Sequence, residues 1–141
     1  MTSTILPLRA LLLFLLSLVA VMRAAPLYAA TDVRGTWTGT FSSNHSGVAP
    51  FTITVVIDAN SNGHLVGTST LNSRCLKGAS LHVTVTGSTV VLAGSDRAGN
   101  NMTLRGSLDD TATLLKSAYI FNGSAGGGCE TDDGTGTLTK R

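Results

Sequence analysis

From residue 33 onward the chain alternates apolar and polar positions with a period of two, which is typical of β-strands that bury one face. The clearest stretch is V-R-G-T-W-T-G-T-F at residues 33–41. Val33, Trp37 and Phe41 share one face with two glycines, while an arginine and three threonines share the other. One face is therefore apolar with room for a large ring. We expect residues 33–42 to form the first strand of a small barrel, with Trp37 filling its floor.

Similar alternating segments follow, and turn residues separate them. Asn62-Gly63 is a strong hairpin signal, and Gly87-Ser88 and Asp109-Asp110 are also typical of tight turns. Together with the first segment, the pattern predicts eight antiparallel strands in an all-β, up-and-down meander that closes into a barrel. Interior glycines favour a tightly coiled barrel over a flat sandwich. The further strands are expected at residues 51–58, 64–72, 79–86, 89–94, 101–108, 111–122 and 129–140.

The first thirty residues follow a different pattern. Residues 10–22 form an apolar run of 13 residues, shorter than the roughly 20 that a membrane-spanning helix needs. This length suits the hydrophobic region of a secretory signal, and small residues follow it. We expect residues 1–29 to be a signal peptide cleaved after Ala29, and residues 30–141 to be one barrel domain. The protein would be periplasmic or secreted, with no membrane span after cleavage; the alternative is an uncleaved membrane anchor.

Cleavage would also change the charge of the protein. Arg9 and Arg23 leave with the leader, so eight basic residues face eight acidic ones and the formal net charge falls from +2 to zero. Basic residues do not cluster along the chain, and no aromatic residues are interleaved with them. These features exclude nucleic acid as an expected partner.

Cys75 and Cys129 both lie in the part of the chain expected to be exported. In an oxidising compartment such a pair is most simply one disulfide. The meander supports this pairing, because loops after odd-numbered strands all lie at one end of the barrel. The alternative is two free buried thiols, and no suitably spaced histidines accompany the cysteines to form a zinc site.

The end of the barrel that holds the cysteines has the longer loops and is the expected mouth, where ligands of such barrels enter. Aromatic residues lie at the mouth ends of three strands and are candidates to line a cavity, although they would equally serve to fill the barrel. The candidate lining residues are Phe41, Phe51, Tyr119 and Phe121, and the candidate polar residues of the mouth are His45, Arg74, Lys77 and Arg97.

The G-T-W of residues 35–37 and the closing T-L-T-K-R of residues 137–141 resemble the calycin barrels, lipocalins and avidins. The resemblance implies that Trp37 packs against a basic residue of the last strand, here Arg141 or Lys140. Since Trp37 is the only tryptophan, no avidin ligand residue is carried over. The cysteine and glycine pattern also resembles small exported bacterial proteins of unassigned function.

The chain carries no motif for catalysis, a cofactor or a metal. Glu130, Asp132 and Asp133 make a calcium site conceivable, but the ordinary interpretation is a solvated strand start. The expected function is therefore a small, non-enzymatic binding module that takes an apolar or amphipathic ligand at the mouth. The alternative is a protein-interaction or protease-inhibitor-like envelope protein that acts through its loops without a cavity.

Overall fold

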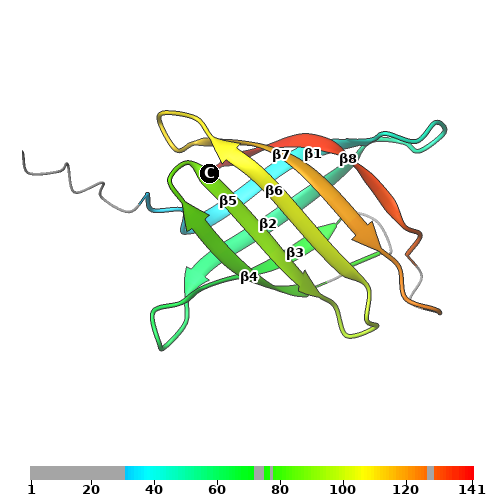
Figure 1. Ribbon diagram of the computed structural model, residues 1–141, viewed down its shortest axis with the longest axis horizontal. Coiled ribbons are helices and arrows are strands. Elements are labelled where there is room, and N and C mark those ends of the chain that lie inside the picture. The colour runs from blue at the N-terminus through cyan, green and yellow to red at the C-terminus, as the bar shows by residue number, and fades with distance from the viewer. Residues whose placement is uncertain (1–30, 72–74, 77, 127–128) are drawn as a thin grey trace, which may run out of the picture.

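The computed structural model describes residues 31–71, 75–76, 78–126 and 129–141, and it shows a closed barrel of eight antiparallel strands (Figure 1). Each strand pairs with the next, and β1 also pairs with β8. The predicted fold class, an eight-stranded meander barrel with one disulfide, is confirmed. The described residues include no helix of the length and apolar character needed to cross a membrane. The strands are β1 (Gly35–Ser43), β2 (Phe51–Ala59), β3 (Leu65–Leu71), β4 (Ala79–Thr86), β5 (Thr89–Ser95), β6 (Asn101–Leu108), β7 (Leu114–Asn122) and β8 (Asp132–Lys140).

Four strands begin later than the hydrophobic pattern predicts, and for β3 the difference is a single residue, Leu65 instead of His64. β1 begins at Gly35 because the residues before it cross the end of the barrel. β7 begins at Leu114, since the Asp109 carboxylate accepts the backbone N–H of Thr113 and of Leu114, both at 2.8 Å, and so prolongs the turn. β8 begins at Asp132, after a segment that the disulfide draws into the mouth.

The inward faces of the strands fill the barrel with apolar side chains. On β6 and β7 buried and exposed positions alternate along the whole strand, as the period of two requires. Trp37, Tyr119 and Phe41 are the largest of the fully buried side chains. Burial of each large apolar side chain contributes about 1.5–3 kcal/mol to folding, so this interior is the main source of stability.

Two glycines of β8 make room for aromatic rings on other strands. A Cβ atom on Gly136 would lie 2.4 Å from ring carbons of Phe41, and one on Gly134 would lie 2.8 Å from the Tyr119 hydroxyl oxygen. Phe41 and Tyr119 therefore occupy the space that side chains at these two positions would fill. The reason is register: Gly136 of β8 pairs with Phe41 of β1, and Gly134 of β8 pairs with Tyr119 of β7.

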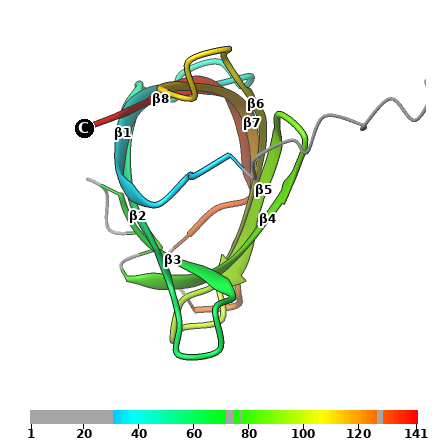
Figure 2. The same ribbon diagram turned by 90° about the vertical axis from the view of Figure 1, so that its left-hand side faces the viewer.

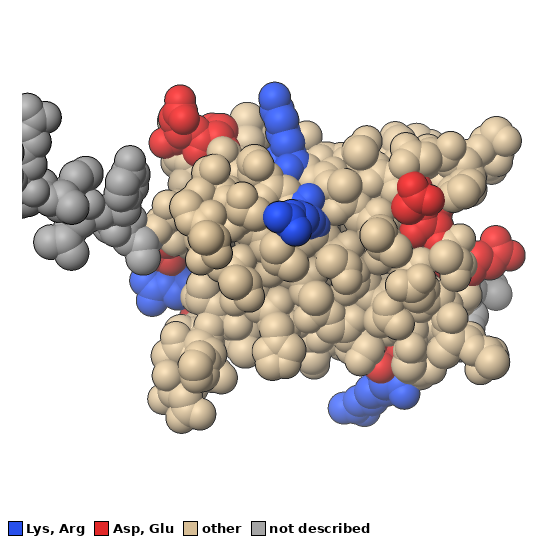
Figure 3. Space-filling model, in the orientation of Figure 1, with Lys and Arg blue, Asp and Glu red and all other residues tan. Residues whose placement is uncertain are grey.

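The outer surface consists largely of small, uncharged polar residues. Threonines occupy most outward positions of β1 and β8, and the hydroxyl oxygens of Thr38 and Thr54 lie 3.3 Å apart across β1 and β2. On the face drawn in Figure 3, lysine and arginine side chains are scattered among neutral residues, and some lie beside acidic side chains. That face therefore carries no basic patch.

Residues 31–34, which we call the N-terminal segment, close one end of the barrel. Figure 2 looks at this end and shows the segment before β1 crossing the opening. Within it Val33 is buried, and its carbonyl oxygen accepts a 2.8 Å hydrogen bond from the Trp37 indole Nε1–H. Gly35 then turns the chain into β1 with a φ of 124°, a conformation that side chains rarely allow. Trp37 thus joins the crossing segment to the core.

The basic residue of β8 that lies against Trp37 is Lys140. Its Nζ atom is 5.7 Å from the centroid of the Trp37 ring and donates a 2.8 Å hydrogen bond to the backbone oxygen of Asp32. Arg141 contributes its backbone N–H, which donates to the carbonyl oxygen of Thr36 at 2.9 Å. Of the two basic residues that the resemblance offered, Lys140 therefore makes the cation–π contact that the structure shows.

One buried hydroxyl in the barrel has no hydrogen-bond partner among the described residues. Ser69 on β3 is completely buried, and its Oγ atom makes no hydrogen bond. We expect Ser69→Ala to leave the free energy of unfolding unchanged or to raise it by up to about 1 kcal/mol, because the change removes a desolvated group that is not compensated. Urea-induced unfolding, monitored by circular dichroism, measures this effect.

Ser117→Ala is the matched control. Its hydroxyl is also buried, but it donates to the carbonyl oxygen of Leu115 at 3.2 Å. This variant is expected to lose about 0.5–1.5 kcal/mol of stability. If Ser69→Ala were the more destabilised of the two, an unpartnered hydroxyl would be the wrong description of Ser69.

Candidate functional site

The two ends of the barrel differ in their connections (Figure 1). At one end short turns join β2 to β3, β4 to β5 and β6 to β7, and the N-terminal segment crosses the opening. At the other end the connections after β1, β3 and β7 are longer, and the connection after β5 is as long as those after β2 and β6. This second end, which we call the mouth, is the one that the meander predicted to be open.

The disulfide lies at the mouth and joins two of its loops. Cys75 and Cys129 are bonded with their Cα atoms 5.0 Å apart, which confirms the predicted pairing. Leu76, which follows Cys75, is completely buried and has a φ of 51°. A non-glycine residue in this conformation costs about 1–2 kcal/mol, and the burial of its side chain offsets that cost. The hydrophobic pattern did not single out Leu76, because one leucine in a polar loop has no periodicity.

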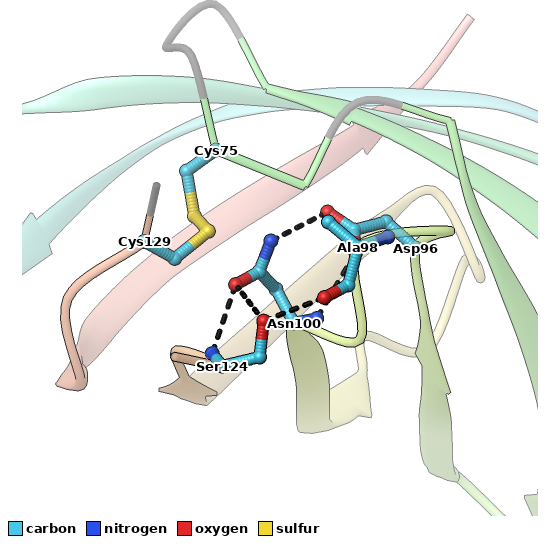
Figure 4. The surroundings of a disulfide bond; sticks show 6 residues. All are labelled: Cys75, Asp96, Ala98, Asn100, Ser124 and Cys129. Atoms are coloured by element: carbon cyan, nitrogen blue, oxygen red, sulfur yellow. Dashed lines mark hydrogen bonds between the residues drawn. A yellow bond between two sulfur atoms is a disulfide. The ribbon is translucent and has the colours of Figure 1, made fainter. Parts of the chain in front are cut away.

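A buried asparagine beside the disulfide ties a third loop to one of the two loops that the disulfide joins (Figure 4). Asn100 is 1% exposed; its Nδ2 donates to Asp96 Oδ2 at 2.9 Å, and its Oδ1 accepts the backbone N–H of Ser124 at 3.0 Å. The loop after β5 is thereby tied to the loop after β7. Sequence reasoning treated residues 95–100 as a turn only, since turn composition does not reveal which loop an asparagine will reach.

A pocket of about 540 Å³ opens at the mouth. The loop between β1 and β2, the disulfide and the segment leading into β8 surround it. Aromatic rings of Phe51 and Phe121 provide apolar surface, and carboxylate, hydroxyl and imidazole groups provide polar surface. The lining residues are His45, Ser46, Val48, Ala49, Phe51, Leu71, Cys75, Phe121, Cys129, Glu130, Thr131 and Asp132.

The four aromatic residues proposed as the lining form one cluster. The ring centroids of Tyr119 and Phe121 are 4.5 Å apart, and those of Phe51 and Tyr119 are 5.3 Å apart. Phe41 lies 5.8 Å from Tyr119 and 6.3 Å from Phe51. Phe51 and Phe121 line the pocket, and Phe121 is also buried in the core, together with Phe41 and Tyr119. The four residues therefore divide into two that face the pocket and two that fill the barrel beneath them.

A carboxylate is held at the boundary between this aromatic cluster and the pocket. Asp132 Oδ2 accepts a hydrogen bond of 2.6 Å from the Tyr119 hydroxyl, and its Oδ1 accepts one of 2.5 Å from the Ser43 hydroxyl. Burial, and then the hydrogen bond to Asp132, raise the pKa of the Tyr119 hydroxyl well above its usual range. Tyr119 therefore remains a neutral donor, and both partners of Asp132 are hydroxyl groups.

The adjacent aspartate ties the loop after β1 to β8. Asp133 Oδ2 accepts the Asn44 side-chain amide at 2.7 Å, and its Oδ1 lies 2.9 Å from His45 Nε2. The hydrogen bond from Asn44, and then that from His45, hold the pKa of Asp133 below its usual range. His45 thus lines the pocket with its ring engaged by Asp133.

We expect the attachment of this loop to weaken in acid. Because the pKa of Asp133 is lower in the folded chain than its ordinary value of 3.8, its stabilising contribution is present above that value and is lost as the pH falls through the folded pKa. The protection factors of the backbone amides of residues 44–49, which compare each exchange rate with the intrinsic rate at the same pH, should therefore fall below about pH 4. Hydrogen exchange by NMR at a series of pH values measures this.

Asp133→Asn is the control, because it removes the titrating group while it keeps the size of the side chain. In this variant the amides of residues 44–49 should already have low protection at neutral pH, and their protection should change less in acid. Identical pH profiles for the two proteins would show that Asp133 does not hold the loop.

Of the remaining predicted polar residues of the mouth, the structure describes Arg97. Arg97 is exposed in the turn after β5 and is not part of the pocket lining. Arg74 and Lys77 lie outside the described residues. Among the described residues, no group of three or more histidine, cysteine, aspartate or glutamate side chains is placed to hold a metal ion, so the structure does not assemble the calcium site considered above.

Comparison with known proteins finds no relative among protein families or curated proteins. No protein-family model matches the chain, and no curated protein matches it in sequence. The functional interpretation therefore starts from the mouth pocket and its chemistry.

Proposed function

We propose that this chain is a small, exported, non-enzymatic binding protein of the calycin type, and that it holds a small amphipathic ligand in the mouth pocket. The observation that carries the proposal is the pocket of about 540 Å³ with aromatic rings on one side and polar groups on the other. Ligand pockets in proteins usually measure about 300–1,000 Å³ and are largely apolar with a few convergent polar groups. An amphipathic molecule matches both surfaces.

Two features support export and the calycin type. The Cys75–Cys129 disulfide suggests an oxidising compartment, which agrees with the signal-like pattern of residues 1–29. The Gly35-Thr36-Trp37 sequence on the first strand, with Lys140 of the last strand against the Trp37 ring, follows the calycin arrangement. The periplasm and the extracellular medium both fit these features.

The hydrogen bonding at the mouth supports binding rather than catalysis. The Ser43 hydroxyl donates to Asp132, whereas the His45 ring pairs with Asp133. Serine and histidine are therefore engaged by different carboxylates and do not form the serine–histidine hydrogen bond that activates a nucleophile.

The test is binding of a neutral amphipathic probe, 6-phenylhexanol, to the protein purified after export so that its disulfide is formed. We expect NMR shifts to change at the pocket residues Val48, Phe51 and Phe121, with little change at Trp37. Ala49→Trp places a large ring on the pocket wall and should abolish binding. Ala98→Trp is the matched control, because Ala98 is exposed at the same end but lies outside the lining.

The failure of the probe to bind to the wild-type protein would overturn this proposal. One observation would then favour the alternative, a protein that contacts another protein through its mouth loops. The loop between β1 and β2 is exposed, and Asp133 holds it in one conformation through Asn44 and His45. A loop held in this way loses less conformational entropy when a protein partner binds it.

A further inference from the structure

We infer that the mouth pocket selects cationic amphiphiles, in which a protonated amine is placed at Asp132 and Glu130 and an apolar body lies against Phe51 and Phe121. This inference deepens the proposed function and rests on it, because it names the chemical class of the ligand. It is carried by the charges of the lining and by the environment of one carboxylate.

The described lining of the pocket is acidic. Glu130 and Asp132 bring two carboxylates to it, and no lysine or arginine is among the described lining residues. His45 is the remaining titratable group there, and its ring is already paired with Asp133, 2.9 Å away. A bound cation would therefore meet two carboxylates that no lysine or arginine of the described lining compensates, while these carboxylates would repel a bound anion.

Asp132 is the better placed of the two carboxylates. It is half-buried, its two hydrogen-bond donors are the neutral hydroxyls of Ser43 and Tyr119, and no cation lies within ion-pair distance of it among the described residues. A carboxylate offers about four acceptor positions, so two hydroxyl donors leave capacity for an ammonium group. Those two bonds also hold the carboxylate in place, which lowers the entropy cost of pairing with a ligand.

The aromatic surface matches the rest of such a molecule. Phe51 lies 5.7 Å from Phe121 between ring centroids, and both line the same pocket as Asp132. Their rings accept an apolar chain or ring through burial, and aromatic faces also attract a nearby cation. An amphiphile with an amine head and an aromatic or aliphatic body therefore makes favourable contacts along its whole length.

The experiment compares three probes with one body and different heads: 6-phenylhexylamine, 6-phenylhexanol and 6-phenylhexanoate. Titration calorimetry at pH 7 with the exported wild-type protein is expected to show the amine binding about tenfold tighter than the alcohol, because a charge-assisted hydrogen bond replaces a neutral one. The carboxylate should bind most weakly. Added salt should weaken binding of the amine and leave binding of the alcohol nearly unchanged.

Two variants locate the effect. Asp132→Asn should reduce the affinity for the amine to that for the alcohol, and Glu130→Gln, which changes an exposed side chain, should cause a smaller loss. The comparison of the three probes on the wild-type protein does not depend on the folding of either variant.

The outcomes separate the inference from the proposed function. Equal binding of amine and alcohol, or tightest binding of the carboxylate, would overturn the inference and leave the proposed function standing. Failure of all three probes would overturn both. Tighter binding of the amine that persisted in both variants would contradict the assignment to Asp132 and Glu130.

Discussion

Replacing Cys75 and Cys129 together with alanine is expected to lower the free energy of unfolding by about 4 kcal/mol. The bond joins residues 54 positions apart, and closing a loop of that length removes much of the freedom of the unfolded chain. The loss should also reach the pocket, because both cysteines line it. We therefore expect binding of 6-phenylhexanol to weaken in the double variant under conditions where it remains folded.

Chemical denaturation of the wild-type and double-alanine proteins, with and without a reductant, measures the effect. Reductant should lower the stability of the wild-type protein to a value near that of the variant and leave the variant unchanged. A variant as stable as the oxidised wild type would show that the two loops are held at the mouth without the bond. The burial of Leu76 in the loop after β3 and the contacts of Asn100 with the loop after β7 would then be sufficient.

Replacing Trp37 with alanine is expected to cost about 3–5 kcal/mol of stability, the range for removal of a large buried aromatic side chain. The ring is 1% exposed, and its Nε1–H donates to the Val33 carbonyl oxygen at 2.8 Å. The change therefore leaves a cavity in the core and an unpaired carbonyl in the segment that crosses the closed end. Amides of residues 32–34 should lose hydrogen-exchange protection while the mouth pocket keeps its shape.

Trp37→Phe separates the two contributions, because it keeps an aromatic ring and removes the N–H donor. Its loss of stability should be clearly smaller than that of Trp37→Ala, and it should still expose the amides of residues 32–34 to exchange. Equal protection of those amides in Trp37→Phe and wild type would show that ring packing, and not the hydrogen bond to Val33, holds the segment. Binding of 6-phenylhexanol should be unaffected in both variants, since Trp37 lies outside the pocket lining.

The fold was largely predictable because its determinants are local. A period of two along each strand and turn residues such as Asn62-Gly63 are properties of neighbouring residues. The disulfide was predictable for a related reason. A meander has one simple topology, so the parity of the strand count places Cys75 and Cys129 at the same end. Strand starts at β7 and β8 were less predictable, because the Asp109 hydrogen bonds and the disulfide loop decide them.

The candidate site was predictable only in part. The sequence pattern placed the aromatic residues at the mouth, but it could not separate Phe51 and Phe121, which line the pocket, from Phe41 and Tyr119, which are buried beneath it. That division depends on how the rings pack across strands. The burial of Leu76 likewise depends on how its loop folds over the barrel, which residue type alone does not show.

The sequence by itself determined the all-β class, the strand number, the pairing of Cys75 with Cys129 and the inward face that holds Trp37, because these follow from periodicity and chain order. The tertiary structure alone decided which neighbouring aspartate faces the aromatic cluster and which ties down a loop. Asp132 and Asp133 are adjacent and chemically identical, yet successive residues of a strand point to opposite faces. Asp132 thereby meets Tyr119 and the pocket, while Asp133 meets Asn44 and His45.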